Sequence, residues 1–421
     1  MAQLAVNGGT PVVDRPLGRR WPIWDERDEQ AVVEVVRSGI WWRGGYPVAA
    51  DSQVGRFEDA WARFHDAAHC VAVTNGTQAI ECALQAAGIE PGDEVLVPAL
   101  TFVASATAIA VVKGVPVFVD VDPAAMEAAI TPRTRAAVIV HNGGYPCDMD
   151  RVLEVARRHG LAIIEDCAHA HGTQWKGQGV GALGSLGTFS FQNFKSLTCG
   201  EGGAILTNDA ELAEKAYSFH HIGRISGRPF YEFHRVGSNL RLTEFQGALL
   251  LSQLSRLPEQ MATRERNASH LAAGLGAIDG LAPIARDPRV TRWGFYFWNL
   301  HYQQEQCEGI ARDTFIEAVR AEGVPLQVGA HGKPIYRNPV FQENHLGRNN
   351  GAIRTALSGE AVDYRQVCCP TAERLAAEQA LSLPHAIFLG DDTSDMDLIL
   401  EAFAKVRANV AELRAREVAA K

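Results

Sequence analysis

Between residues 55 and 210, short apolar runs alternate with longer amphipathic segments, and this pattern limits the possible folds more than any other feature. The apolar runs are nearly continuous and rich in β-branched residues; they read AHCVAVT, VLVPA, VPVFVDVD, RAAVIVH and LAIIED. Strands of this composition are buried on both faces, because amphipathic helices cover both sides of a parallel sheet. The pattern therefore predicts an α/β domain with a mostly parallel sheet flanked by helices.

Two later runs, LGTFSFQ and GGAILTND, bring the predicted sheet to about seven strands. A glycine-containing loop joins them, where parallel neighbours would need a crossover helix. We therefore expect some departure from an all-parallel order.

A long helical pattern, EFQGALLLSQLSRLPEQMATRERNASHLAAGL, follows, and we expect it to carry the chain out of the large domain. The remainder combines an aromatic strand, RWGFYFWNLHY, with the helical pattern TFIEAVRAEG and one long closing helix, SDMDLILEAFAKVRANVAEL. The sequence thus predicts an N-terminal arm (1–20), a large α/β domain (21–256) and a smaller C-terminal α+β domain (257–421).

The charge balance and the cysteines exclude several classes of partner. The 40 Lys and Arg residues stand against 49 Asp and Glu, a net charge of -9, which leaves no basic footprint for nucleic acid or an anionic membrane. The most apolar long run, ALTFVASATAIAVV, is about 14 residues and contains Thr and Ser, so it is too short to span a bilayer. The 8 cysteines form no CxxC pair, which favours free thiols in a reducing, cytoplasmic compartment.

The segment Asn75-Gly76-Thr77 lies between the first apolar run and a helical pattern. In doubly wound sheets, ligands bind beyond the carboxyl ends of the strands. Gly76 lets the backbone approach a ligand, and the start of the helix offers free N–H groups and the positive end of its dipole. Gly76 and Thr77 therefore suit a phosphate cradle; the alternative is that Thr77 is simply an N-cap.

Asp166 ends the apolar run LAIIED. An acid at the end of a buried strand is costly unless a cation or hydrogen-bond donors satisfy it, so Asp166 pairs with a protonated ring nitrogen or caps the next loop. His169 and His171 follow after Cys167, but no third His stands nearby, and we predict no metal site. Phe102, after VLVPAL, is either a core residue or a face for a planar ligand.

The segment TFSFQNFKSLTCGEGG contains a single lysine, Lys195, in a stretch poor in charge. Burial at the end of an apolar strand lowers the pKa of a lysine and makes its amine nucleophilic. Such amines form Schiff bases with carbonyl compounds, including pyridoxal phosphate. A structural lysine in a salt bridge is the alternative.

Pyridoxal phosphate would use these strand-end residues together. The cofactor needs an amine for its aldehyde, an acid for its pyridinium nitrogen, a flat partner for its ring and a site for its phosphate. Lys195 and Asp166 meet the first two needs. The remaining partners would be Phe102, His169, Gly76, Thr77 and Ser190.

Several longer strings make the chain similar to a known family: NGTQAIECAL, GIEPGDEVLVPALTFVASATAI, FVDVDP, IEDCAHAHG, GTFSFQNFKSLTCGEGGAI and GSNLRLTEFQGALL. They resemble the DegT/StrS-type sugar and cyclitol aminotransferases, which are fold-type I pyridoxal phosphate enzymes, and the similarity runs over most of the chain. The resemblance implies the fold-type I architecture, pyridoxal phosphate as cofactor and transfer of an amino group.

The resemblance also implies roles for the residues around the cofactor ring. Lys195 would hold the cofactor as a Schiff base and would move a proton as general base and acid. Asp166 would pair with the pyridinium nitrogen, and His169 and Phe102 would pack near the ring. Some relatives carry His in place of the lysine and catalyse dehydration, and Lys195 argues against that branch.

The phosphate would lie between two subunits. Gly76, Thr77 and Ser190 match the family's phosphate-binding positions, and Asn239, in GSNLR, would reach the phosphate of the neighbouring subunit. The resemblance therefore implies a homodimer with shared active sites.

The substrate-contacting positions leave the keto-substrate open. Trp42 and Arg43, in GIWWRGG, resemble both aminohydroxybenzoate synthases and ketocyclitol aminotransferases, whereas LAVNGGTPV and HGKPIYRNP look more like the ketocyclitol branch. Here His331 and Tyr336 would contact substrate; relatives acting on nucleotide-sugars often have His where Tyr336 stands. Trp42 as a core or interface residue is the alternative.

The resemblance thus implies an enzyme that moves an amino group from glutamine or glutamate to a keto-cyclitol (scyllo-inosose-like) or keto-sugar in aminoglycoside or other antibiotic biosynthesis. The alternatives are a dehydratase and aromatase similar to 3-amino-5-hydroxybenzoate synthase, and a nucleotide-ketosugar aminotransferase. A cofactor-binding regulator without turnover is a third class, which the intact set of Lys195, Asp166 and Ser190 disfavours.

Overall fold

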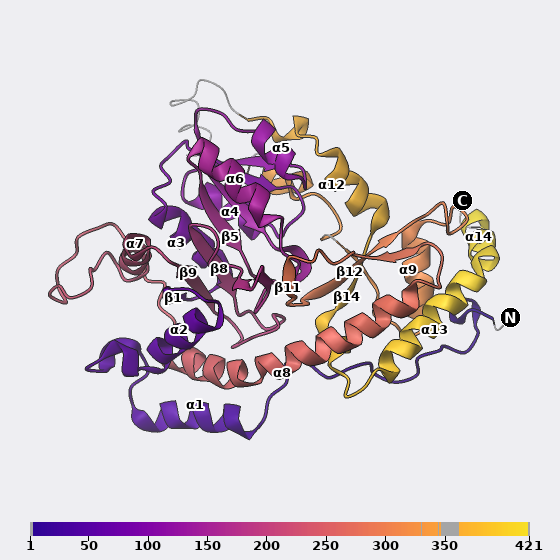
Figure 1. The fold of residues 1–421 in the computed structure, drawn as a ribbon, viewed down its shortest axis with the longest axis horizontal. Coiled ribbons are helices and arrows are strands. Elements are labelled where there is room, and N and C mark those ends of the chain that lie inside the picture. Colours follow the sequence, from indigo (N-terminus) through magenta and orange to yellow (C-terminus); the bar gives the residue numbers. More distant parts are fainter. Residues whose placement is uncertain (1–2, 330, 344, 347–361, 420–421) are drawn as a thin grey trace.

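Seven strands form the central sheet of the computed structural model, which describes residues 3–329, 331–343, 345–346 and 362–419 (Figure 1). From one edge to the other, the strands are β1 (His69–Val73), β9 (Gly203–Thr207), β8 (Leu186–Ser190), β5 (Ala162–Asp166), β4 (Thr134–Val140), β2 (Glu94–Pro98) and β3 (Val115–Val119). Six of the strands run in one direction, and β9 runs in the opposite one. The predicted strand count and the predicted departure from an all-parallel order are both confirmed.

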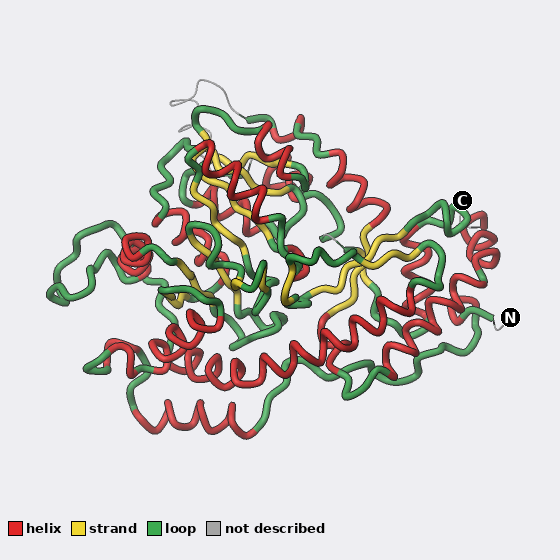
Figure 2. Tube along the Cα trace, viewed as in Figure 1, coloured by secondary structure: helices red, strands yellow, loops and turns green. Residues whose placement is uncertain are grey.

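Helices cover both faces of this sheet, as Figure 2 shows in red around the yellow strands. Successive strand residues face different apolar clusters: Val71 and Val73 join one, and Ala72 joins the other. The first cluster includes α3 (Gly76–Ala86), α4 (Ala104–Val111) and α7 (Ala210–His220). The second includes α2 (Gln53–Phe64), α5 (Pro123–Ala128), α6 (Met149–His159) and α8 (Glu244–Leu275). Two covered faces explain why the strands are apolar at nearly every position.

A second, antiparallel sheet follows in the C-terminal part. Its strands, in spatial order, are β10 (Leu281–Pro283), β12 (Phe297–Tyr302), β14 (Ala380–Pro384) and β13 (Gln327–Val328), and α9 (Arg312–Ala321) and α13 (Ser394–Ala408) belong to the same core. A third, small sheet contains β11 (Val290–Arg292), β6 (Gln174–Trp175) and β7 (Gln178–Gly179).

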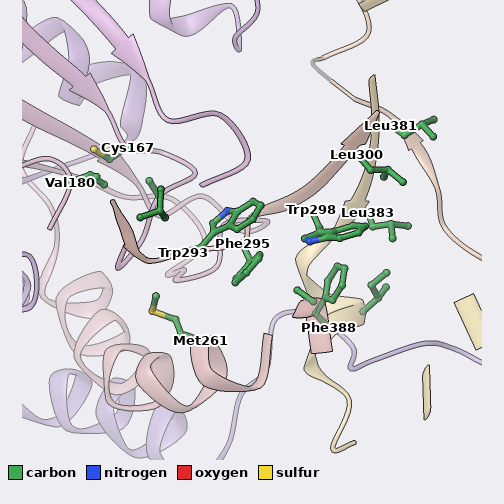
Figure 3. Close-up of a cluster of buried hydrophobic side chains, with 14 of the residues drawn as sticks. Cys167, Val180, Met261, Trp293, Phe295, Trp298, Leu300, Leu381, Leu383 and Phe388 are labelled. Carbon is green, nitrogen blue, oxygen red and sulfur yellow. The ribbon is translucent and has the colours of Figure 1, made fainter. Parts of the chain in front are cut away.

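Between these sheets lies an aromatic stretch of the core. Trp293 stacks on Phe295 with ring centroids 4.4 Å apart, and Trp298 lies 5.9 Å from Phe388. Figure 3 shows the first pair near Met261 of α8 and the second beside Leu383. The predicted aromatic strand is shorter than expected, because it begins only at Phe297, two residues after a left-handed backbone at Phe295 (φ 46°).

The closing segment is not the single helix that the sequence predicts. It divides into α13 and α14 (Val410–Ala419) at Asn409. The Asn409 side chain donates to the Lys405 carbonyl at 2.7 Å, so it competes for an acceptor of the helical ladder. The residue's backbone leaves the helical region there (φ -111°, ψ 28°).

The 32-residue helix α8 joins the two parts of the molecule (Figure 1). Its contacts run from α1 (Glu26–Ser38) and α2 to α13 at the far end. The predicted domain boundary after residue 256 falls inside this helix and stays a prediction. The expected N-terminal arm lies along the C-terminal part, where the Gly18 amide donates to Asp395 at 2.8 Å.

One C-terminal segment returns to the large sheet. Tyr336, Phe341 and Tyr364 pack around Phe118 of β3, with ring centroids 5.0 to 5.6 Å from it. The segment also contains the short helices α10 (Pro339–Gln342) and α12 (Pro370–Arg374). No helix within the described residues has both the length and the apolar content needed to cross a membrane.

Candidate active site

A cavity of about 730 Å³ opens at the carboxyl ends of the parallel strands. Because β1, β5 and β8 point the same way, the loops that follow them meet at this edge of the sheet. Eight of the residues singled out in the sequence line the cavity: Gly76, Thr77, Phe102, Asp166, His169, Ser190, Lys195 and His331.

The Lys195 amine enters this cavity from a short loop after β8. The Lys195 amide donates to the Gln192 carbonyl at 2.8 Å, which closes a turn and aims the side chain inward. Burial lowers the pKa of Lys195 to about 8, and the charge of Asp166 opposes that shift. No ion pair among the described residues includes Lys195, so the alternative of a salt-bridged structural lysine does not hold within this part of the chain.

Asp166 is buried at the end of β5 with two donors on its carboxylate. Ser105 donates to Oδ2 at 2.8 Å, and the Ala168 amide donates to Oδ1 at 3.1 Å. Because the Ser105 hydroxyl hydrogen is used this way, its oxygen accepts from Thr101, 2.8 Å away. Two neutral donors leave the carboxylate able to accept a further charged donor from the cavity.

His169 lies flat against neighbouring rings beside Lys195. Its ring stacks on Tyr296 at 4.3 Å with an interplanar angle of 26°, and its Nδ1 accepts from the Gly143 amide at 3.3 Å. Burial, with a smaller effect of the Lys195 charge, lowers the pKa of His169 well below its usual value. The ring is therefore neutral, and it forms part of the cavity lining.

His171 has both ring nitrogens engaged in hydrogen bonds. Its Nε2 donates to the Ser190 carbonyl at 2.9 Å, which leaves Nδ1 to accept from Ser196 at 3.1 Å. The residue therefore ties the Lys195 loop to the end of β5.

Gly76 and Ser190 lie against each other in the lining of the cavity. Any Cβ at Gly76 would lie 2.5 Å from the Ser190 Cβ, so only glycine lets the start of α3 come this close to β8. The N-cap of α3 is Asn75, whose side chain accepts from the Gln78 amide at 2.9 Å. The alternative of Thr77 as N-cap is therefore wrong. The cap uses the Gln78 amide, and the amides of Gly76 and Thr77 can still donate to an anion.

Four other residues that the sequence predicts for the site do not line this cavity. Arg43 makes a paired hydrogen bond with Glu58, both distances 2.8 Å, and Trp42 lies against Phe230 with ring centroids 6.4 Å apart. The Tyr336 side chain is fully buried and donates to Glu373. The exposed Asn239 pairs with His221 as an isolated bridge at the surface.

His331 lies at the mouth of the cavity in a left-handed backbone conformation (φ 57°). Its ring is 5.7 Å from His169 and 6.4 Å from Phe102. Desolvation by the surrounding protein, with a smaller effect of Lys195, lowers the pKa of His331 to about 4. The neutral ring can donate one hydrogen bond and accept another.

Sequence reasoning missed Tyr296, Ser105 and the buried Glu165. Tyr296 belongs to the aromatic run RWGFYFWNLHY, in which nothing separates a cavity residue from a core residue. Ser105 is the second residue of α4, and only the fold brings its hydroxyl to Asp166.

Behind the cavity, His141, Glu165 and Cys167 group their potential ligand atoms within 4.8 Å. Four donors already satisfy the Glu165 carboxylate: His141 Nε2 at 3.0 Å, and the amides of Gly181, Leu183 and Gly184 at 2.8, 2.9 and 2.6 Å. Such saturation indicates a network that holds the loop between β7 and β8 against β5.

The mixed sheet, with a lysine, an acid and a glycine-backed helix start at its carboxyl edge, is the architecture of a fold-type I aminotransferase. Residues 22–388 match the DegT/DnrJ/EryC1/StrS aminotransferase family, and the chain belongs to that family. This confirms the resemblance seen in the sequence.

Full-length relatives carry related names. The chain is 39% identical to the L-glutamine:2-deoxy-scyllo-inosose aminotransferase of Micromonospora echinospora, covering 98% of this chain and 100% of the relative. It is 38% identical to the L-glutamine:scyllo-inosose aminotransferase of Streptomyces griseus, covering 98% and 99%. The crystal structure of 3-amino-5-hydroxybenzoic acid synthase aligns with a TM-score of 0.81 at 35% identity, covering 93% and 99%.

Proposed function

We propose that the cavity binds pyridoxal phosphate and that the enzyme transfers an amino group from glutamine to a keto-cyclitol of the scyllo-inosose type. The observation that carries the proposal is the meeting of the Lys195 amine, the Asp166 carboxylate and the Gly76–Ser190 cradle in one cavity. The cradle fits a phosphate, because its close approach leaves no room for a side chain and faces the first-turn amides of α3. Enzymes of this family and their solved relatives use this cofactor.

Each residue would then have one task. Pyridoxal phosphate, when bound, supplies an electron sink for the bond that breaks at the substrate carbon. The Asp166 carboxylate would accept a hydrogen bond from the pyridinium nitrogen, and the flat His169 face would support the ring. The Lys195 Nζ would anchor the cofactor and, when released, would take a proton from the substrate carbon and return one in the reverse half.

The substrate proposal is supported by the names of full-length relatives, which specify L-glutamine and inosose substrates. Glutamate remains an alternative donor. At the mouth of the cavity, His331 and Phe102 would face the substrate: the neutral imidazole can pair with ring hydroxyls, and the exposed phenyl ring can cover the apolar face of a cyclitol.

A panel assay tests the substrate proposal. Purified enzyme loaded with pyridoxal phosphate is given glutamine and, separately, scyllo-inosose, 2-deoxy-scyllo-inosose, aminodehydroshikimate and a nucleotide-linked ketosugar. We expect one of the inososes to give an aminocyclitol with the highest kcat/KM. Turnover of the nucleotide-linked sugar alone would overturn the proposal.

The similarity to 3-amino-5-hydroxybenzoic acid synthase favours a second candidate, an aromatising dehydratase that uses the same lysine. Product mass separates the two reactions. Amino transfer replaces the carbonyl with an amino group and keeps every ring hydroxyl. Aromatisation loses water and gives a product that absorbs ultraviolet light. Aminodehydroshikimate as the best substrate would establish the second candidate.

We also propose that two copies form a dimer in which Asn239 reaches the partner's phosphate site, and that the enzyme is cytoplasmic. The segment around Asn239 exposes a set of large apolar side chains that a second copy would cover: Phe230, Tyr231, Phe233 and Val236.

Mixing two inactive variants tests the shared site. A heterodimer of Lys195→Ala and Asn239→Ala contains one site with both native residues only if Asn239 acts across the interface. We expect activity to return on mixing. Mixed protein that forms heterodimers but stays as inactive as its parents would show that Asn239 acts within its own chain.

A further inference from the structure

We propose that Tyr296 and His385 are positioning residues for Lys195: the ring of the first covers the amine, and the second fixes the backbone that carries it. The inference rests on the proposed role of Lys195. Both residues come from the C-terminal part of the chain, so that part would set the position of the reacting amine.

The face of Tyr296 lies over the Lys195 amine. Nζ is 4.4 Å from the ring centroid, within the range of a cation–π contact. Two further ring contacts fix the orientation of Tyr296, since it stacks on His169 at 4.3 Å and on His385 at 5.7 Å. Tyr296 is itself buried, and its amide donates to the Gly143 carbonyl at 3.0 Å.

His385 holds the loop from the other side. Its Nε2 lies 3.1 Å from the Phe194 carbonyl, next to Lys195, and burial lowers the pKa of His385 well below its usual value. The ring is therefore neutral, and because a carbonyl can only accept, Nε2 carries the proton and donates it. Trp21 packs edge-on against His385 at 4.6 Å and donates to the Asn193 carbonyl at 2.8 Å.

Two consecutive carbonyls before Lys195 are thus held by side chains from outside the large sheet. The amide of His385 also donates to the Tyr296 carbonyl at 3.2 Å, which links the two positioning residues. Contacts at Asn193 and Phe194 fix the backbone from which the Lys195 side chain extends to the ring of Tyr296.

The proton affinity of the amine follows from the groups around it. The acidic or basic groups that act on Lys195 are Asp166 from β5, His169 and His171 from the next loop, His331 at the mouth, and His385. The histidines have lowered pKa values, so Asp166 and the ring of Tyr296 are the contacts that favour the ammonium form. Removing the ring therefore makes the amine easier to deprotonate.

The experiment measures Lys195 in the cofactor-free protein. Acetic anhydride reacts with neutral amines, so the pH at which labelling of the Lys195 peptide is half-maximal reports the amine's proton affinity; the exposed Lys333 serves as reference within each sample. Tyr296→Leu is expected to lower this midpoint by about 0.5 to 1 pH unit, whereas Tyr296→Phe keeps the ring and the midpoint. An unchanged or raised midpoint in the leucine variant would overturn the role of the ring.

His385 is tested by the matched pair Gln and Leu. His385→Gln can still donate to the Phe194 carbonyl, but His385→Leu leaves it unpaired. Amide hydrogen exchange of the 192–199 peptide is expected to increase at least about tenfold in His385→Leu only. Equal exchange in the Gln and Leu variants would refute the role of His385.

A parallel measurement keeps the two proposals separate. Pyridoxal phosphate is added to each variant, reduced with borohydride and mapped. If no variant, including the native protein, carries the label at Lys195, the proposed function fails. If every variant carries it with the same midpoint and the same exchange, only the positioning inference fails.

Discussion

Gly76→Ala is the sharpest perturbation of the candidate phosphate site. The added Cβ would lie 2.5 Å from the Ser190 Cβ and 3.2 Å from its Cα, whereas ordinary contacts begin near 3.4 Å. The neighbours are backbone and a short side chain, so α3 must move away from β8 by about 1 Å. Overpacking of this kind costs about 1–3 kcal/mol of folding stability.

The shift separates the two halves of the cradle, the α3 amides and the Ser190 hydroxyl. Hydrogen bonds to a charged group contribute about 1.5–3 kcal/mol each, and losing one would weaken cofactor binding about 10- to 100-fold. Absorbance titration of the cofactor-free protein with pyridoxal phosphate gives the Kd, and urea unfolding gives the stability.

Two further variants separate the steric effect of the added Cβ from the loss of a hydrogen-bonding group. Gly276→Ala is the matched control, because a Cβ there meets only Ala273 O at 3.6 Å, and both readouts should stay native. Adding Ser190→Gly to Gly76→Ala removes the clashing Cβ; stability should recover, but affinity should not, because the hydroxyl is gone. A Gly76→Ala protein with native affinity would refute the cradle.

Three other substitutions test the electrostatics. Lys195→Met should stabilise the cofactor-free protein by about 1–3 kcal/mol at pH 7, because the lowered pKa of Lys195 means that folding opposes its protonation. The gain should be full below pH about 8 and shrink to nothing near pH 10.5; a gain that urea titrations find constant with pH would contradict this. Asp166→Asn removes the charge and leaves one acceptor oxygen for two donors, the Ser105 hydroxyl and the Ala168 amide. We expect kcat to fall at least about 100-fold and the free energy of unfolding in urea to fall by about 1–3 kcal/mol; near-native kcat would argue against its pairing role. Glu165→Gln turns an amino group toward donors and should cost about 2–4 kcal/mol in urea unfolding, whereas the exposed Glu401→Gln should cost less than about 0.5; equal costs would refute the network.

The sequence predicts the large sheet well because local and global signals agree there. Each segment there has a local signal that agrees with the fold: the apolar runs, the glycine loop after Ser190 and the long helical pattern of α8. The strands are buried on two faces, so they are apolar at nearly every position and easy to recognise. The predicted single closing helix is wrong, because the Asn409 side chain hydrogen-bonds to a backbone carbonyl and the apolar periodicity does not reveal this.

The candidate site contains residues that the sequence predicts and residues that depend on tertiary packing. Lys195, Asp166 and Gly76 follow directly from strand ends, and parallel strands bring their ends together. Tyr296 lines the cavity and His385 contacts the loop before Lys195. Both residues flank strands of a separate sheet, so their position depends on how the two parts of the chain pack. Tyr336 shows the reverse case, since a residue that resembles a substrate contact packs into the core when its segment returns to β3.

Borohydride reduction of the loaded enzyme, followed by peptide mass spectrometry, tests the central claim most directly. We expect a pyridoxyl group on the peptide that contains Lys195, and none in Lys195→Ala. A label on another lysine of the native enzyme, or no label from a preparation that binds the cofactor, would contradict the assignment of Lys195.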